Sequence, residues 1–289
     1  MRNALTAEFY KVYRRRMTYI LLASASFLVL LFYVILWLRV REGPQHADLR
    51  SYVNWLALRD GLAFKNVVPY GFALERFFAT LVCVIFAGTI MGNEYDWRTV
   101  GVVTARGVKR WHFLLAKLIV GIAFTVLTVA CCFVVASLAS LWFSHLYHLS
   151  YGSFTIVRFG DVFASLARTV FVILPFVVMA LLFATQWRSA GQAVGASLGF
   201  YFIEGIFTSL LTNAEGFLAH IPDALFNVNG DAIMAANGVV SSGSDGGGGP
   251  FSIPTGGPPE WRALLVLAAW LAVLGAAAFW RFQQRDIQE

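Results

Sequence analysis

The sequence predicts an all-α membrane protein with six transmembrane helices. Three observations support this fold class: 58% of the 289 residues are hydrophobic, only 13% are charged, and the apolar residues gather in six long runs. A soluble domain carries roughly 25% charged residues, so most of the surface of this chain is expected to face lipid.

The six apolar runs are expected to form six spans within a single transmembrane permease domain, residues 1–289. A helix needs about 20 apolar residues to cross a hydrocarbon core of roughly 30 Å. The segments that meet this requirement are 18–38, 72–91, 111–143, 162–185, 191–211 and 261–279. No small-residue cleavage pattern follows the first run, so it is expected to stay as an anchor rather than act as a removable signal.

Basic residues set the expected orientation of the chain. An even number of spans places both termini on one side, and that side collects about twelve Lys and Arg residues against about six on the other. By the positive-inside rule, the richer side is cytoplasmic. We therefore expect a multi-pass protein of the cytoplasmic (inner) membrane with both termini in the cytoplasm.

Residues 1–17 predict an interfacial amphipathic helix on the inner leaflet. Leu5, Phe9 and Val12 recur at helical spacing, while Lys11 and a run of three arginines supply positive charge. A disordered basic tail is the alternative.

Two kinds of external segment precede the sixth span. Apolar residues after the fifth span are interrupted by Pro222 and Gly230, which predicts a broken helical segment that folds back into the outer leaflet. Residues 238–259 are rich in Gly, Ser and Pro and cannot bury enough apolar surface to offset the entropy of ordering. We expect them to form a flexible external loop. The segment between the first two spans is expected to hold a short surface helix around Trp55.

Charged residues inside the spans are expected to avoid lipid, because each costs about 2.5–3.5 kcal/mol near the bilayer centre. Arg168 and Glu204 each lie about two turns below the outer face of their spans. We predict that they form an intramembrane pair, which either holds two spans together or lines a polar cavity. Glu75 and Arg76 lie near the outer start of the second span, and Lys117 lies near the inner face, so snorkelling is expected for all three.

Sequence motifs for catalysis are missing: the chain has no GxxxxGK[ST], no HExxH and no GxSxG. His145 and His148 lack a third ligand, so ordinary interface histidines are the better interpretation. The chain is not expected to be an enzyme, to carry a cofactor or metal, or to bind nucleic acid, because its basic residues adjoin the apolar runs and meet membrane lipids.

The charged segment at 92–111 lies between the second and third spans, on the predicted cytoplasmic side. Thr99 can cap a short helix that runs to about Ala105, and Gly107 would end it. A helix held at both ends by long spans can transmit a push from a partner to those spans. A plain loop, with Trp97 as an interface anchor, is the alternative.

This segment resembles the loop between spans two and three in the permease subunits of ABC transporters of the type-2 exporter (ABC-2) family. The positions that match are Glu94, Tyr95, Thr99, Arg110 and Lys117, whereas Arg98 stands where the family commonly has Gly. The closing FWRFQQRDI is similar to the family's Phe-x-Arg-Arg-Asp-Ile, with Gln284 in place of the first Arg. With the basic N-terminus, the six spans and the broken segment, the resemblance covers nearly the whole chain.

The resemblance implies that this loop is a coupling helix docking on a separate ABC ATPase subunit, which binds ATP and Mg. It also implies two permease halves, identical or homologous, above two ATPase copies. The residues implied in coupling are Glu94, Tyr95, Trp97, Thr99, Val102, Val103, Thr104 and Ala105.

The sequence therefore predicts the transmembrane subunit of an ATP-driven exporter that moves an amphipathic substrate, such as an antibiotic, a peptide or a lipid. A sensor or assembly scaffold that uses the same coupling without cargo is the alternative. An ion-driven secondary transporter ranks third, because Glu204 is the one good midplane carboxylate that the sequence offers it.

Overall fold

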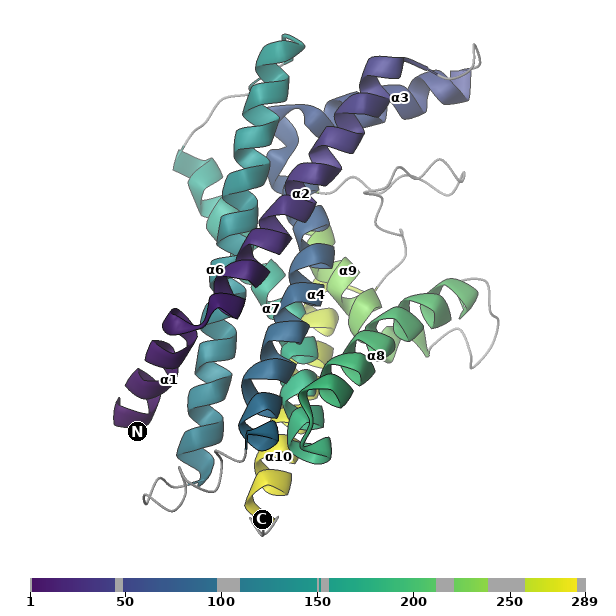
Figure 1. Ribbon diagram of the computed structural model, residues 1–289. Helices are drawn as coiled ribbons and strands as arrows, with labels where there is room; N and C mark the ends of the chain where they lie inside the picture. The colour runs from purple at the N-terminus through teal and green to yellow at the C-terminus, as the bar shows by residue number, and fades with distance from the viewer. Residues whose placement is uncertain are drawn as a thin grey trace.

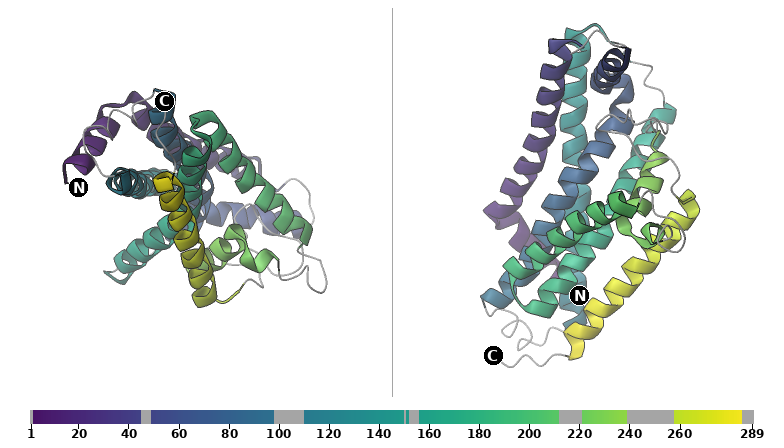
Figure 2. Two further views of the ribbon diagram at one scale, coloured as in Figure 1. Left: turned by 90° about the horizontal axis from the view of Figure 1, so that it is seen from below. Right: turned by 90° about the vertical axis from the view of Figure 1, so that its right-hand side faces the viewer.

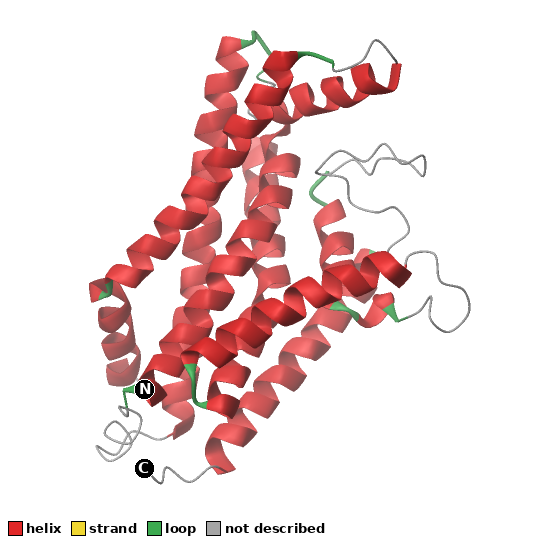
Figure 3. Ribbon diagram, turned by 45° about the vertical axis from the view of Figure 1, so that its right-hand side comes forward, coloured by secondary structure: helices red, strands yellow, loops and turns green. Residues whose placement is uncertain are grey.

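The computed structural model confirms the predicted all-α class: every element of regular structure in the described residues is a helix (Figure 3). The structure describes residues 2–44, 49–97, 110–149, 151, 156–211, 221–238 and 258–284. The predicted flexible loop, apart from residues 238, 258 and 259, lies outside these ranges.

The helices follow one another from α1 to α10 (Figure 1). Their bounds are α1 (Arg2–Arg14), α2 (Arg16–Glu42), α3 (Leu49–Leu62), η1 (Phe64–Asn66), α4 (Val67–Asp96), α6 (Arg110–Leu146), α7 (Ile156–Trp187), α8 (Ala190–Leu211), η3 (Pro222–Ala224), α9 (Phe226–Ala235) and α10 (Glu260–Gln284). In the described part of the chain, six helices are long and apolar enough to cross a membrane, namely α2, α4, α6, α7, α8 and α10. The chain is a multi-pass membrane protein, and each predicted span lies within one of these helices.

The predicted N-terminal helix is present as α1, and a sharp bend separates it from α2. The bend occurs at Arg15, whose backbone is extended with φ −79° and ψ 123°. The Thr18 hydroxyl donates a hydrogen bond to the Val12 carbonyl at 2.8 Å, which ties the start of α2 to the end of α1. α1 packs against α6 near the lower end of the bundle (Figure 1).

The two ends of the molecule carry different elements. α1, the last turn of α4, the first turn of α6 and the end of α10 lie at one end, which we call the α1 end, while α3 lies at the other (Figures 1 and 2). The predicted surface helix near Trp55 is present as α3, and the indole Nε1 of Trp55 donates to the Val40 carbonyl at 2.9 Å.

α4 is the central helix of the bundle. In its most apolar stretch 72% of the residues are buried, against 22% in α2 and 17% in each of α8 and α10. The close approach of α8 to α4 depends on two glycines. A Cβ at Gly88 would lie 2.7 Å from Val194 Cγ2, and one at Gly92 would overlap the backbone of Ala190.

The predicted broken segment forms η3 and α9, which pack against α7, α8 and α10 (Figure 2). The Phe226 ring lies edge-on to Phe176 at 5.2 Å and to Trp270 at 5.3 Å between ring centroids. Gly230 lets α9 approach the spans, because a Cβ there would lie 2.6 Å from Val172 Cγ1. α9 is thus a short helix buried among the ends of longer ones.

Candidate functional site

Four charged side chains form a closed ring at the α1 end, where α1 meets α4 and α6. Lys117 Nζ donates to Glu8 Oε2 at 2.7 Å and to Glu94 Oε1 at 2.9 Å. Lys11 Nζ donates to Glu8 Oε1 at 2.9 Å and to Glu94 Oε1 at 3.0 Å. Positive and negative groups alternate around the ring, which we call the Glu94 cluster, and it joins three helices that are distant in sequence.

The Glu94 cluster is buried. The side chains of Lys117, Glu94 and Glu8 are 1%, 2% and 6% exposed. A buried charge without a partner is costly, but in this ring each of the four groups has two partners of opposite sign and the net charge is zero. The prediction that Lys117 snorkels to the headgroups is wrong, because its ammonium group turns inward to these two carboxylates.

The local structure explains why Glu94 needs cations. It lies in the last turn of α4, where the helix carries partial negative charge and disfavours a carboxylate. The two lysines offset this, and the Arg15 guanidinium lies 3.9 Å away at the rim. Burial lowers the pKa of the Lys11 ammonium, but the hydrogen bonds and charges of Glu8 and Glu94 outweigh burial and raise that pKa above its ordinary value.

The segment at 98–109, which we call the connection, separates α4 from α6 in the sequence. Glu94 precedes the connection by four residues and Lys117 follows it by eight. The connection itself lies outside the described residues, and so do five of the eight predicted coupling residues, namely Thr99, Val102, Val103, Thr104 and Ala105.

The structure describes the other three predicted coupling residues. Glu94 lies in the cluster, and Tyr95 is half-buried against the apolar core. Trp97 is 61% exposed, and the Arg15 guanidinium lies 5.2 Å from the centre of its ring. Between them, the Asp96 carboxylate accepts a hydrogen bond from the backbone N–H of Ala190 at 3.4 Å, which ties the end of α4 to the start of α8.

Sequence reasoning missed the part played by Glu8 and Lys11. A signal was present, since Glu8 is the one acidic residue among residues 1–17 and lies three residues after Leu5 and four before Val12. It therefore shares the apolar face of the helix. An acid on that face of a basic helix indicates a buried cation, and Lys117 supplies one.

A second polar cluster, the Arg76 cluster, consists of Arg76, Glu204, Asn227 and Asp231 and attaches α9 to α4 and α8. Arg76 forms an ion pair with Asp231, and its Nη2 donates to the Asn227 carbonyl oxygen at 3.0 Å. Glu204 Oε1 accepts from the backbone N–H of Asn227 at 2.7 Å. The prediction that Arg76 snorkels is wrong, because its side chain turns inward to α9.

The predicted pair of Arg168 and Glu204 is also wrong. Arg168 Nε instead donates to Glu260 Oε1 at 3.2 Å, and its Nη1 donates to Asn237 Oδ1 at 3.3 Å. Glu204 faces the first turn of α9, where free N–H groups and the positive end of the helix dipole favour a carboxylate. α9 thus supplies the partner of Glu204, whereas Arg168 is bound by Asn237 and by Glu260 at the start of α10.

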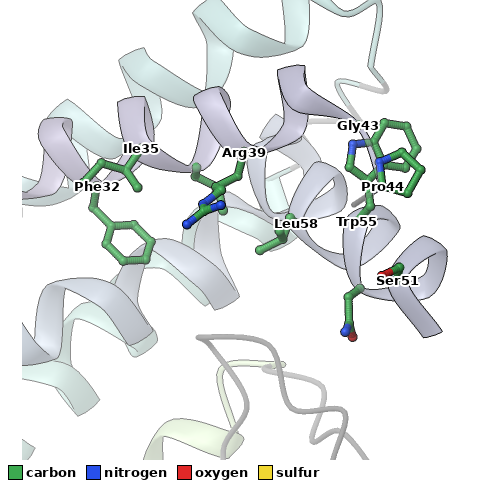
Figure 4. A pocket seen from close by; sticks show the side chains of 10 residues that line it. Phe32, Ile35, Arg39, Gly43, Pro44, Ser51, Trp55 and Leu58 are labelled. Carbon is green, nitrogen blue, oxygen red and sulfur yellow. The ribbon is translucent and has the colours of Figure 1, made fainter. Parts of the chain in front are cut away.

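A cavity of about 450 Å³ lies at the α3 end between α2 and α3 (Figure 4). Phe32, Ile35 and Leu58 give it an apolar wall, while Arg39 and Ser51 add polar groups. Cavities with this mixture suit a molecule that has one apolar part and one polar part.

The described residues contain no group of three or more His, Cys, Asp or Glu that could hold a metal ion. His145 Nδ1 lies 3.4 Å from the Tyr151 hydroxyl. His148 lies three residues further on, in a backbone conformation with φ 50°.

Residues 72–288 match the model of a protein family whose description is "Protein of unknown function (DUF2705)". The match begins in α4 and includes Glu94, Lys117 and the whole Arg76 cluster, but α1 and α2 precede it. No curated protein matches the chain.

Proposed function

We propose that this chain, which belongs to the DUF2705 family of proteins of unknown function, is the transmembrane subunit of an ATP-driven exporter. A separate ABC ATPase, present in two copies, binds ATP and Mg and docks on the connection at 98–109. Two permease halves, identical or homologous, complete the transporter. The proposed substrate is amphipathic, such as an antibiotic, a peptide or a lipid.

The Glu94 cluster is the observation that carries this proposal. It fixes the two helices that bound the connection to each other and to α1. Removing one partner from a buried ion pair costs about 3–5 kcal/mol, so a push on the connection moves the three helices together more easily than it separates them. Since α4 packs against α2, α6, α7 and α8, the displacement reaches the whole bundle.

The distribution of basic residues supports the placement of the ATPase. The side that includes the α1 end holds about twelve Lys and Arg residues against about six on the other side. By the positive-inside rule this end faces the cytoplasm, where ATP is available. We therefore propose that the chain lies in the cytoplasmic membrane with both termini inside.

The cavity between α2 and α3 supports the proposed substrate class. Its apolar wall and polar rim match a molecule with a hydrocarbon part and a polar head, and its volume of about 450 Å³ is within the range of small-molecule sites.

The test is to purify the full chain from the cells that produce it, identify the proteins that accompany it, and measure ATP hydrolysis by the complex in proteoliposomes. We expect a soluble ATPase chain whose activity amphiphiles stimulate. Glu94→Gln should abolish that stimulation, whereas Glu42→Gln, which alters an exposed residue, should keep it.

Two results would overturn the proposal: no ATP-hydrolysing chain accompanies the protein, or the purified chain alone moves solute uphill. A complex that hydrolyses ATP but responds to no amphiphile would instead favour the sensor or scaffold.

A further inference from the structure

Glu75 is a fully buried carboxyl group in the first half of the central helix. Its side chain is 0% exposed, and neither Oε1 nor Oε2 has a hydrogen-bond partner among the described residues. Sequence reasoning expected it to snorkel, and that prediction is wrong. Successive residues of a helix point about 100° apart, and the neighbouring Arg76 forms its ion pair with Asp231 on α9.

The surroundings of Glu75 come from α2, α4 and α6 and are mostly apolar. A Cβ at Gly71 would lie 3.7 Å from Glu75 Oε1 and equally far from the Ala136 Cβ of α6, so the carboxyl group lies where α4 faces α6. One ring of α4 and one of α6, Phe72 and Phe133, stack at 4.6 Å nearby.

The titratable groups near Glu75 are neutral ones. Tyr33 of α2 and Cys132 of α6 are close enough for a charge on Glu75 to act on them, and both are buried. Among the charged groups of the elements around it, Arg76 of α4 is bound to Asp231, Lys117 of α6 is bound to Glu8 and Glu94, and Arg39 of α2 is bound to Glu42. The described residues therefore place no cation against this carboxyl group.

Two other buried acids of the protein each have a hydrogen-bond donor at one or both oxygens. Glu94 Oε1 accepts from two lysines, and Glu204 Oε1 accepts from a backbone N–H in the first turn of α9, although Glu204 Oε2 has no partner among the described residues. Glu75 has neither kind of partner among the described residues, and an ionised carboxylate without partners is too costly to bury. The neutral, protonated carboxylic acid is the form that fits this site.

We propose that Glu75 is a proton-binding site, and that its proton exchanges with water only when α2 and α6 separate from α4. The bundle then binds a proton each time it closes around Glu75 and can release it each time it opens. This inference does not depend on the identity of the energy source, because it rests on the packing of α2, α4 and α6.

The test uses the full chain in detergent or proteoliposomes with dicyclohexylcarbodiimide, a hydrophobic reagent that modifies protonated carboxyl groups. The acid O–H adds across one C=N bond: a C–O bond forms, the proton moves to nitrogen, and the adduct rearranges to a stable N-acylurea. Peptide mass spectrometry should find this adduct at Glu75, and the yield should fall as the pH rises. Glu75→Gln should remove it, whereas Glu204→Gln should leave the adduct at Glu75.

A second measurement covers the stability of the fold. Because the folded state holds a proton that the unfolded state releases, the unfolding temperature of the wild type should fall as the pH rises from about 5 to about 9. Glutamine has the shape of the protonated acid but cannot ionise, so Glu75→Gln should lack this part of the pH dependence.

Each measurement can refute the proposal. A wild-type chain that gains no adduct at Glu75 at any of these pH values, while exposed Glu42 reacts with a water-soluble carbodiimide, would show that the bundle does not open around a protonated Glu75. A constant difference in unfolding temperature between wild type and Glu75→Gln across this pH range would show that Glu75 is not a protonated acid. If Glu75→Gln fails to fold, the labelling of the wild type decides the question.

Discussion

Lys117→Met tests whether the Glu94 cluster binds the three helices together. The substitution keeps the apolar stem of the side chain but removes the ammonium group that donates to Glu8 at 2.7 Å and to Glu94 at 2.9 Å. The ring then changes from two positive and two negative charges to one positive and two negative. Loss of one partner from a buried ion pair costs about 3–5 kcal/mol, and we expect a loss of that size in the free energy of unfolding.

The assay is unfolding in mixed micelles, measured together with stimulation of the partner ATPase. The matched control is Lys65→Met. The pair formed by Lys65 and Asp60 spans 3.6 Å, and its side chains are 40% and 60% exposed. Exposed pairs contribute about 0–1 kcal/mol, so the control should change stability little.

A double variant makes the test specific to charge. Adding Glu94→Gln to Lys117→Met returns the ring to zero net charge, so part of the lost stability should return. If Lys117→Met cost no more than Lys65→Met, or if the second substitution only added to the loss, the idea that these charges hold the three helices together would be refuted.

Three further predictions concern other parts of the molecule. A proline at Val102 or an aspartate at Val103 should abolish stimulation of the partner ATPase while membrane insertion, measured by protease protection, stays intact; normal stimulation would contradict the role of the connection. Gly92→Leu should lower the free energy of unfolding by about 1–3 kcal/mol or more because its side chain overlaps the α8 backbone, whereas Gly195→Ala, which has open space, should not. The carboxylates of Glu8 and Glu94 raise the pKa of Lys11. The stabilisation that charged Lys11 gives to the folded state is therefore full below the ordinary lysine pKa and is lost as the pH rises through the raised pKa. Lys11→Met should remove this loss of thermal stability at alkaline pH.

The spans could be predicted from the sequence because lipid imposes one simple requirement on them. A helix that crosses the hydrocarbon core must be apolar over about 20 residues, and that pattern is local. Each predicted span therefore lies within a helix of the structure, although the helices extend further, as α4 does when it reaches Asp96.

The partners of the buried charges could not be predicted in the same way. Glu8 and Lys117 are 109 residues apart, and they meet because α1, which is separated from α2 by the bend at Arg15, packs against α6. Matching Arg168 with Glu204 by depth gave the wrong pair because depth says nothing about which face a residue occupies. Depth also did not indicate that the first turn of α9 lies beside Glu204.

The position of the buried charges suggests how the two ends of the protein communicate. Glu75, Arg76 and Glu94 all lie on α4, the most buried of the spanning helices. Arg76 and Glu94 are 18 residues apart, which is about 27 Å along a helix. A helix of this length is stiff along its axis, so an axial displacement at Glu94 is carried to Arg76. Because Arg76 is bound to α9, that displacement must either move α9 with α4 or break the ion pair with Asp231. In either case α9, which packs against α7, α8 and α10, responds to what happens at the α1 end, which is the mechanical property that the proposed transporter requires.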